Sequence, residues 1–161
     1  MIVIVMGVTG AGKTTVGRLL ASSMGWVFAD ADDFHPPANI EKMHEGIPLD
    51  DRDRLPWLES LRSQICAWTY AGQNAVLACS ALKRVYRKIL DVGPEVRFVY
   101  LRGHRDLIAE RLEVRHGHFA DEKILAGQFA DLEEPDDVPA FDITGTPQQI
   151  AEAIRKNLNL A

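Results

Sequence analysis

Two hydrophobic patterns alternate along this chain. Short apolar or apolar-rich runs, typical of buried β-strands, cover residues 2–6, 26–29, 74–79, 96–101 and 140–143. Between them, apolar residues recur every three or four positions, as on amphipathic helices, in the regions 16–24, 38–45, 58–68, 85–90, 106–113, 121–132 and 150–158. Strands that alternate with helices predict an α/β fold, with about five strands in a parallel sheet and helices on both faces.

The helix through residues 58–68 follows a charged run, residues 50–54, that is expected to cap it. Pro56 then lies early in this helix, where the missing N–H of proline has no cost. The short strand 26–29 is expected to be buried, and it runs directly into acidic residues. Because open α/β sheets bind ligands at the carboxyl ends of their strands, those acidic residues are candidates for a site.

Length and charge limit the possible functions. The chain has 161 residues, so one domain spanning residues 1–161 is expected. The net charge is −5, whereas nucleic-acid binders usually carry a basic excess, so no nucleic-acid partner is expected. The N-terminal apolar run is too short for a membrane span and lacks the basic segment of a signal peptide. Cys66 and Cys79 form no C-x-x-C motif, which favours a reduced, cytoplasmic protein with no membrane partner.

The strongest motif is residues 7–14, Gly-Val-Thr-Gly-Ala-Gly-Lys-Thr, which match the P-loop pattern G-x-x-x-x-G-K-[ST] between a strand and a helix. Its glycines allow positive φ angles, so that successive N–H groups form a nest for phosphate oxygens at a helix N-terminus. Lys13 would reach the β- and γ-phosphates of a nucleoside triphosphate, and the Thr14 hydroxyl would complete the shell of a Mg²⁺ ion. The motif therefore predicts a P-loop NTPase fold.

A P-loop alone does not separate a kinase from a GTPase or a motor. Residues 142–145, Asp-Ile-Thr-Gly, match the D-x-x-G motif of GTPases by letter. No N-K-x-D guanine motif occurs anywhere in the chain, and only one helix follows residues 142–145. We therefore interpret this match as a coincidence, and the acceptor side of the site has to decide the function.

Asp30 and Asp32 follow the second expected strand. If the chain stays extended there, their side chains point the same way, so that one carboxylate holds a Mg²⁺-bound water and the other accepts a hydroxyl proton. Which aspartate has which role is left open. The alternative is an acidic N-cap before a turn.

Basic residues form two clusters after the second and third strands. The first contains Lys42, Arg52 and Arg54. The second contains Lys83, Arg84 and Arg87. Each cluster alone is typical of a solvated helix face, but two beside one crevice favour a small anionic acceptor, because arginine binds carboxylates and phosphates through two parallel hydrogen bonds.

Several longer runs are similar to those of the gluconate kinases. They are residues 30–36, 39–43, 46–49, 51–58, 79–87, 117–119, 128–129 and 132–135. The similarity covers nearly the whole chain and includes an insert, about residues 33–58, that distinguishes this family from shikimate kinases and nucleoside monophosphate kinases. The resemblance implies ATP-dependent phosphorylation of the 6-hydroxyl of D-gluconate, giving 6-phosphogluconate and ADP, and it suggests a homodimer.

The resemblance also implies roles for single residues. Asp32 would be the base, with Asp30 at the metal-bound water. A small helical lid, about residues 111–132, would bring Arg111 and Arg115 to the transferring phosphoryl group or to adenine. The implied nucleotide-binding residues are Gly7, Val8, Thr9, Gly10, Ala11, Gly12, Lys13, Thr14, Thr15, Arg111 and Pro147. The implied gluconate contacts are Asp32, His35, Lys42, Arg52, Arg54, Lys83, Arg87 and His118.

Two other functions stay open. The chain would alternatively be another small-molecule P-loop kinase, for shikimate or a different sugar acid, or a nucleotide-binding regulator without catalysis. The intact Lys13, Thr14, Asp30 and Asp32 argue against the regulator. His116 and His118 resemble a metal pair, but two ligands without a nearby cysteine do not favour zinc.

Overall fold

A five-stranded parallel sheet forms the centre of the molecule. The computed structural model describes residues 1–116 and 119–160, with side chains described outside residues 114–122. Within them the strands are β1 (Ile2–Met6), β2 (Val27–Asp30), β3 (Ala75–Ala78), β4 (Val96–Arg102) and β5 (Ala140–Asp142). They pair in parallel in the order β2-β3-β1-β4-β5. The predicted parallel α/β sheet is confirmed, and its central strand is the one that leads into the P-loop.

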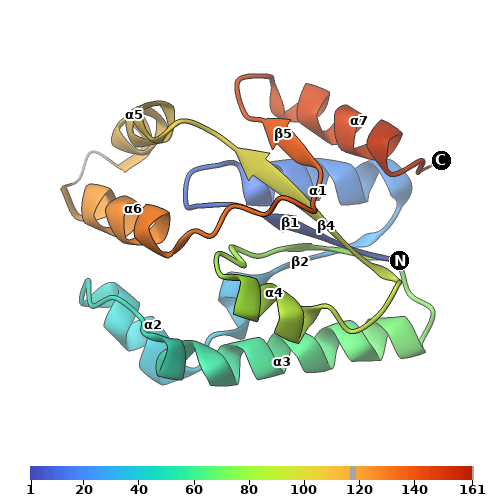
Figure 1. The fold of residues 1–161 in the computed structure, drawn as a ribbon, viewed down its shortest axis with the longest axis horizontal. Coiled ribbons are helices and arrows are strands. Elements are labelled where there is room, and N and C mark those ends of the chain that lie inside the picture. The colour runs from blue at the N-terminus through green and yellow to red at the C-terminus, as the bar shows by residue number, and fades with distance from the viewer. Residues whose placement is uncertain (117–118, 161) are drawn as a thin grey trace.

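Helices cover both faces of the sheet (Figure 1), as predicted. They are α1 (Lys13–Met24), α2 (Pro37–His44), α3 (Asp51–Tyr70), α4 (Arg84–Leu90), α5 (Arg105–His116), α6 (Phe119–Asp131) and α7 (Pro147–Asn157), with a short 3₁₀ helix η1 (Ala31–Phe34) after β2. α1 and α7 lie on one face, and α3 and α4 lie on the other. In the part of the chain that the structure describes, no helix has both the length and the apolar character needed to cross a membrane.

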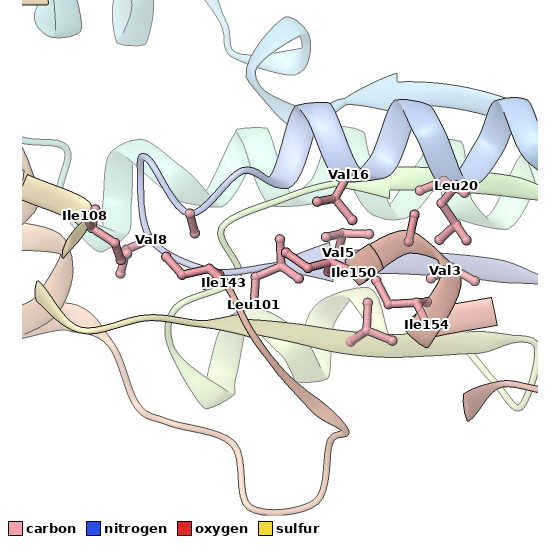
Figure 2. Packing of buried hydrophobic residues seen from close by; sticks show 14 of the residues in the cluster. Val3, Val5, Val8, Val16, Leu20, Leu101, Ile108, Ile143, Ile150 and Ile154 are labelled. Carbon is pink, nitrogen blue, oxygen red and sulfur yellow. The ribbon is translucent and has the colours of Figure 1, made fainter. Parts of the chain in front are cut away.

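The two faces of β1 supply two hydrophobic cores, because successive strand residues point to opposite sides. Val3 and Val5 pack with the residues of α1 and α7 that Figure 2 labels: Val16, Leu20, Ile150 and Ile154. Ile2, Ile4 and Met6 belong to the other core, together with the apolar side of α3 and with α4. Every residue of β1 is fully buried, which explains its unbroken apolar run.

Two local expectations were wrong. β2 lies at the edge of the sheet, so it is only partly buried, and Val27 is 36% exposed. α3 begins earlier than expected, because Asp50 and Asp53 form a reciprocal capping box at its N-terminus. Pro56 therefore lies beyond the first turn, where its missing N–H leaves the Arg52 carbonyl without its usual helical partner.

Candidate active site

The P-loop leaves the carboxyl end of β1 and turns into α1. Gly10 has φ +79° and Gly12, the N-cap of α1, has φ +95°. A Cβ on Gly10 would lie 3.0 Å from the Leu112 side chain and 3.1 Å from that of Ile108, so this position excludes larger residues by both backbone angle and space. The left-handed backbone that the motif predicted is therefore present, with the N-terminus of α1 at its end.

A cavity of about 410 Å³ lies over this loop. Its lining residues are Thr9, Gly10, Gly12, Lys13, Thr14, Thr15, Asp30, Asp32, Ala78, Cys79, Ser80 and Gln128. Five predicted nucleotide-binding residues are absent from the lining: Arg111, Pro147 and three residues of the P-loop itself. Val8 and Ala11 are buried in the core, and the Gly7 N–H donates to the Ser80 carbonyl oxygen at 3.3 Å, which joins the P-loop to the end of β3.

The two P-loop side chains that carry the predicted chemistry already make polar contacts. Lys13 Nζ donates to the Val8 carbonyl oxygen at 2.9 Å, across the loop. The Thr14 hydroxyl donates to Asp30 Oδ2 at 2.7 Å. The second contact brings two oxygen ligands of the kind that Mg²⁺ prefers together at the base of the cavity.

Asp30 and Asp32 both line the cavity, but not through the extended backbone that the sequence suggested. The chain turns into η1 directly after β2, and Asp30 is its N-cap, with Oδ1 accepting from the Asp32 N–H at 2.9 Å. The N-cap alternative is therefore correct for Asp30. Asp30 already accepts two hydrogen bonds, from Thr14 and from Asp32, which leaves the Asp32 carboxyl as the other acidic group of the cavity.

The electrostatics of the cavity distinguish its acidic and thiol groups. Desolvation in the cavity, followed by the charge of Asp30, raises the pKa of Asp32, and Lys13 opposes this shift. Asp32 as a whole residue is nevertheless exposed to solvent. Burial raises the pKa of the Cys79 thiol to about 12, so this thiol stays neutral and is not a nucleophile near pH 7.

The two basic clusters meet around one tyrosine. Arg54 Nη1 donates to the Tyr86 hydroxyl at 2.9 Å, and both Arg54 and Lys83 lie over the Tyr86 ring. The Tyr86 hydroxyl donates to Asp51, which also pairs with Lys83 at 2.9 Å. The structure therefore brings together cations that are about thirty positions apart in the sequence, and none of them lines the P-loop cavity.

Each of three predicted acceptor cations has a carboxylate partner. Lys42 Nζ lies 2.9 Å from both carboxylate oxygens of Asp53. Arg54 pairs with Asp131 of α6 at 3.1 Å, and Lys83 pairs with Asp51. Arg52, by contrast, is exposed at the start of α3 and makes no ion pair with the residues that the structure describes.

Arg87 differs from the other members of its cluster. Its side chain is 8% exposed, and Nη1 donates to the Ala81 and Leu82 carbonyl oxygens at 2.8 and 3.0 Å. Nη2 donates to the Glu133 carbonyl oxygen at 2.9 Å. Arg87 therefore ties the loop after β3 to the loop after α6.

Two further predicted nucleotide contacts, Arg111 and Pro147, lie near the segment that joins β5 to α7. Arg111 of α5 donates to the Ile143 carbonyl oxygen at 2.7 Å, beside the end of β5. Pro147 is the first residue of α7, after a capping box made by Thr146 and Gln149. His118 and the side chain of Arg115 lie outside the described residues.

Sequence reasoning missed several residues of this site. The Oε1 atom of Gln128, in α6, accepts from the Thr9 N–H at 2.5 Å and so contacts the P-loop from the expected lid. Ser80 lines the cavity at the end of β3. Glu133 Oε1 accepts from the Arg84 N–H at the start of α4. Gln128 and Glu133 lie within the family-like runs, but residue type alone gave no reason to assign chemistry to them.

Comparisons with known proteins identify relatives of this chain. The family model for shikimate kinase matches residues 9–125 of the chain. A probable gluconokinase of Xenopus tropicalis is 44% identical over 151 residues, which cover 84% of this chain and 80% of that protein. The gluconokinase of Gluconobacter oxydans (strain 621H) is 47% identical over 145 residues, 88% of this chain and 81% of that protein.

A solved structure extends the likeness to three dimensions. The crystal structure of a gluconokinase from Sinorhizobium meliloti 1021 has a TM-score of 0.85 and 37% sequence identity to this chain, and the match covers 98% of this chain and 94% of that one. The resemblance that the sequence motifs indicated is thereby confirmed. With this identity over most of its length and with the same fold, the chain belongs to the gluconokinase family of P-loop kinases.

Proposed function

We propose that this protein transfers the terminal phosphoryl group of ATP to the 6-hydroxyl of D-gluconate, giving 6-phosphogluconate and ADP. One observation carries the proposal: a P-loop and an aspartate with a raised pKa line the same cavity. Phosphoryl transfer needs a grip on the triphosphate and a group that orients and deprotonates the acceptor hydroxyl, and these are the two parts present.

On the nucleotide side, we assign ATP binding to the P-loop, residues 7–15, and phosphate binding to its main-chain N–H groups other than those of Gly7 and Ala11, which donate to carbonyl oxygens. The helix N-terminus and the left-handed glycines favour an anion there. Lys13 would leave the Val8 carbonyl oxygen for the β- and γ-phosphates, because a charge-assisted bond to a phosphate is stronger than a bond to a carbonyl. Arg111 and Pro147 would lie on the adenine side, and Arg115 would act from a lid at about residues 111–132.

We assign the base role to Asp32 and the metal role to Asp30. A general base needs a proton affinity close to the working pH, and desolvation moves the pKa of Asp32 in that direction. Asp30 instead accepts a hydrogen bond from the Thr14 hydroxyl. In P-loop enzymes, a serine or threonine hydroxyl at this position completes the Mg²⁺ shell.

These residues fit a magnesium ion that is held mainly by phosphates and water. Within the described ranges, no group of three or more His, Cys, Asp or Glu side chains is arranged to hold a metal, and Mg²⁺ in kinases needs only one or two protein oxygens. When bound, Mg²⁺ would neutralise charge on the β- and γ-phosphates. Thr14 and Asp30 would then orient its shell from one side of the cavity.

We assign the acceptor site to the insert of about residues 33–58 and to the start of α4. The proposed gluconate contacts are Asp32, His35, Lys42, Arg52, Arg54, Lys83 and His118. We do not assign Arg87, which the resemblance also implies, to gluconate, because its guanidinium already donates to three carbonyl oxygens. For Lys42, Arg54 and Lys83, contact with the gluconate carboxylate would replace or share an existing aspartate partner. We further propose a cytoplasmic homodimer, from the family resemblance and from the cysteine pattern.

The test is an ADP-release assay with a panel of acceptors. Gluconate, shikimate, other sugar acids and neutral polyols are each added to the purified protein with ATP and Mg²⁺, and Lys13→Ala serves as the control. We expect turnover with gluconate well above every other acceptor and none with Lys13→Ala. Preferred turnover of shikimate or another acid would overturn the substrate, and nucleotide binding without turnover of any acceptor would indicate a regulator.

A further inference from the structure

Asn39 is a buried polar residue beside the proposed acceptor site. It lies in α2 and is 3% exposed, and among the described residues only Asn39 and Arg87 are polar or charged and buried. Its Nδ2 atom donates to the Asp53 carbonyl oxygen at 2.8 Å and lies 3.2 Å from His35 Nδ1. A buried amide requires partners, and this one links α2 both to α3 and to the segment before α2.

The Asp53 contact fixes the orientation of the amide group. A backbone carbonyl oxygen only accepts hydrogen bonds, so the Asn39 atom that faces it must be the nitrogen and not the oxygen. The same nitrogen faces His35 Nδ1, and its second hydrogen is available for that contact. His35 Nδ1 must therefore accept, which requires a neutral imidazole with its proton on Nε2.

Other contacts hold the ring in place. His35 stacks on Trp57, with ring centroids 4.4 Å apart and planes 12° apart. Trp57 is itself held by a bond from Nε1 to the Ala31 carbonyl oxygen at 2.7 Å, within η1. The position of the His35 ring is thus linked to the segment that carries Asp30 and Asp32.

The surroundings of His35 also keep it uncharged. Burial, and then the positive charge of Arg54 in α3, lower the pKa of His35 to about 4. Trp57 and Asn39, which pack on the ring from α3 and α2, bring no charge of their own. A ring that is neutral near pH 7 and whose tautomer is fixed has one donor, Nε2–H.

We propose that Asn39 is a positioning residue that fixes His35 as the Nε2–H tautomer, so that His35 donates a hydrogen bond to a hydroxyl oxygen of the acceptor. This role for the ring rests on the proposed function, because it places the acceptor beside His35. A neutral donor suits a polyol hydroxyl better than a carboxylate, which the cations nearby would bind. The same amide supports the backbone of Asp53, the partner of Lys42.

The tautomer is tested directly by nuclear magnetic resonance. Long-range ¹H–¹⁵N spectra of the histidine rings distinguish the two neutral tautomers and the imidazolium, and His35→Phe identifies the signals of His35. We expect the neutral Nε2–H form in the wild type between about pH 6 and pH 8. A neutral Nδ1–H form, or an imidazolium in that range, would overturn the proposal, whether or not gluconate is the substrate.

The positioning role is tested by Asn39→Asp, because a carboxylate accepts where the amide donates. We expect the His35 proton to move to Nδ1 or the ring to become protonated. The KM for gluconate should rise about ten-fold, which is the loss of one good hydrogen bond, with the KM for ATP unchanged. Asn157→Asp, at the exposed C-terminal end of α7, is the matched control and should change neither quantity.

His35→Phe and His35→Gln separate hydrogen bonding from packing. Phenylalanine keeps a ring for Trp57 but has no donor, so it should raise the KM for gluconate as Asn39→Asp does, whereas glutamine retains an N–H and should recover part of the loss. If Asn39→Asp does not fold, this pair and the wild-type spectra still decide. Equal KM values for gluconate in His35→Phe and the wild type would overturn the proposal. Absence of gluconate turnover in the wild type would instead overturn the proposed function, and with it the role of the ring, but not the tautomer.

Discussion

Replacing Arg87 by methionine should destabilise the protein without weakening gluconate binding. The sequence places Arg87 in a basic cluster and the family resemblance makes it a substrate contact. In the structure its guanidinium makes three hydrogen bonds to carbonyl oxygens, on Ala81, Leu82 and Glu133. A guanidinium that is buried and engaged in this way has little freedom to bind a second anion.

The loop that Arg87 contacts needs this support. Ala81 has φ +44°, a left-handed backbone that costs a residue with a Cβ about 1 kcal/mol or more. Two of the three hydrogen bonds end on Ala81 itself and on the next carbonyl. The Glu133 N–H also donates to the Leu82 carbonyl oxygen, so the two loops are joined at adjacent points.

The expected loss follows from these contacts. Hydrogen bonds to a charged group contribute about 1.5–3 kcal/mol each, but burying the guanidinium has a desolvation cost and methionine restores part of the packing. We therefore expect the free energy of unfolding of Arg87→Met to fall by about 3 kcal/mol. For a chain of this size, that corresponds to a decrease in Tm of about 6–12 °C.

Thermal and urea unfolding, followed by circular dichroism, measure this change. The KM for gluconate is measured at a temperature well below both transitions. Arg84→Met is the matched control, because Arg84 lies on the same helix but is exposed, and its ion pair with Asp136 is long, at 3.9 Å. Its replacement should therefore change the stability by less than about 0.5 kcal/mol. An unchanged Tm for Arg87→Met, together with a ten-fold higher KM for gluconate, would refute the reasoning and support a direct substrate contact.

Three further predictions concern the cavity and the core. Asp32→Asn should abolish turnover and leave the ATP affinity nearly unchanged. The raised pKa of Asp32 means that the folded state favours the neutral carboxyl, so the variant should also have a higher Tm than the wild type at pH 7. This difference in Tm should shrink as the pH falls and the wild-type carboxyl becomes protonated. Gly17→Ala should lower stability by about 1–2 kcal/mol in urea unfolding, since its Cβ would lie 2.8 Å from the Phe28 ring, a clash larger than the gain in helix propensity. Gln128→Ala should speed amide exchange at Thr9 in the nucleotide-free protein, and an unchanged exchange rate would contradict the bond between them.

The sequence predicted the main elements well, because their patterns are local. β1 and β4 read as apolar or apolar-rich runs. α1 ends at Met24, at the end of the expected helical region 16–24, and Gly25, with a φ of +67°, caps it. The P-loop was recognisable because its glycines and its flanking elements have a fixed order. For these parts, residues within a few positions of one another carry the information.

The aspartate pair shows where local reasoning ends. A D-x-D segment is compatible with either an extended strand or a capped turn, and both were considered. The turn is stabilised by Asp30, which accepts a hydrogen bond from the Asp32 N–H, and by the Trp57 indole, which donates to the Ala31 carbonyl oxygen. That second contact joins positions 26 residues apart, so no local pattern reveals it.

The basic clusters show that local sequence also does not determine which residues are functional. Lys83 and Arg87 lie on the same short segment, and their residue types predict the same role. Tertiary contacts separate them: Lys83 pairs with a carboxylate beside Tyr86, whereas Arg87 bonds only to carbonyl oxygens in the interior. Sequence position and charge describe both residues equally, so only the fold distinguishes a candidate anion contact from a structural cation.

Three cations of the proposed acceptor side, Lys42, Arg54 and Lys83, already have carboxylate partners, and this affects how an acid would bind. Arg54 is half-buried and pairs with Asp131, so removal of that partner would leave a charge in a region of low dielectric, at a cost that a surface pair would not have. An incoming carboxylate that replaces Asp131 restores the pairing, whereas a neutral polyol does not. We therefore expect the site to prefer acids over neutral polyols, even if its affinity for either is modest. Because Asp131 lies at the end of α6, exchange of its partner would also release one contact between the acceptor region and the helix that carries Gln128.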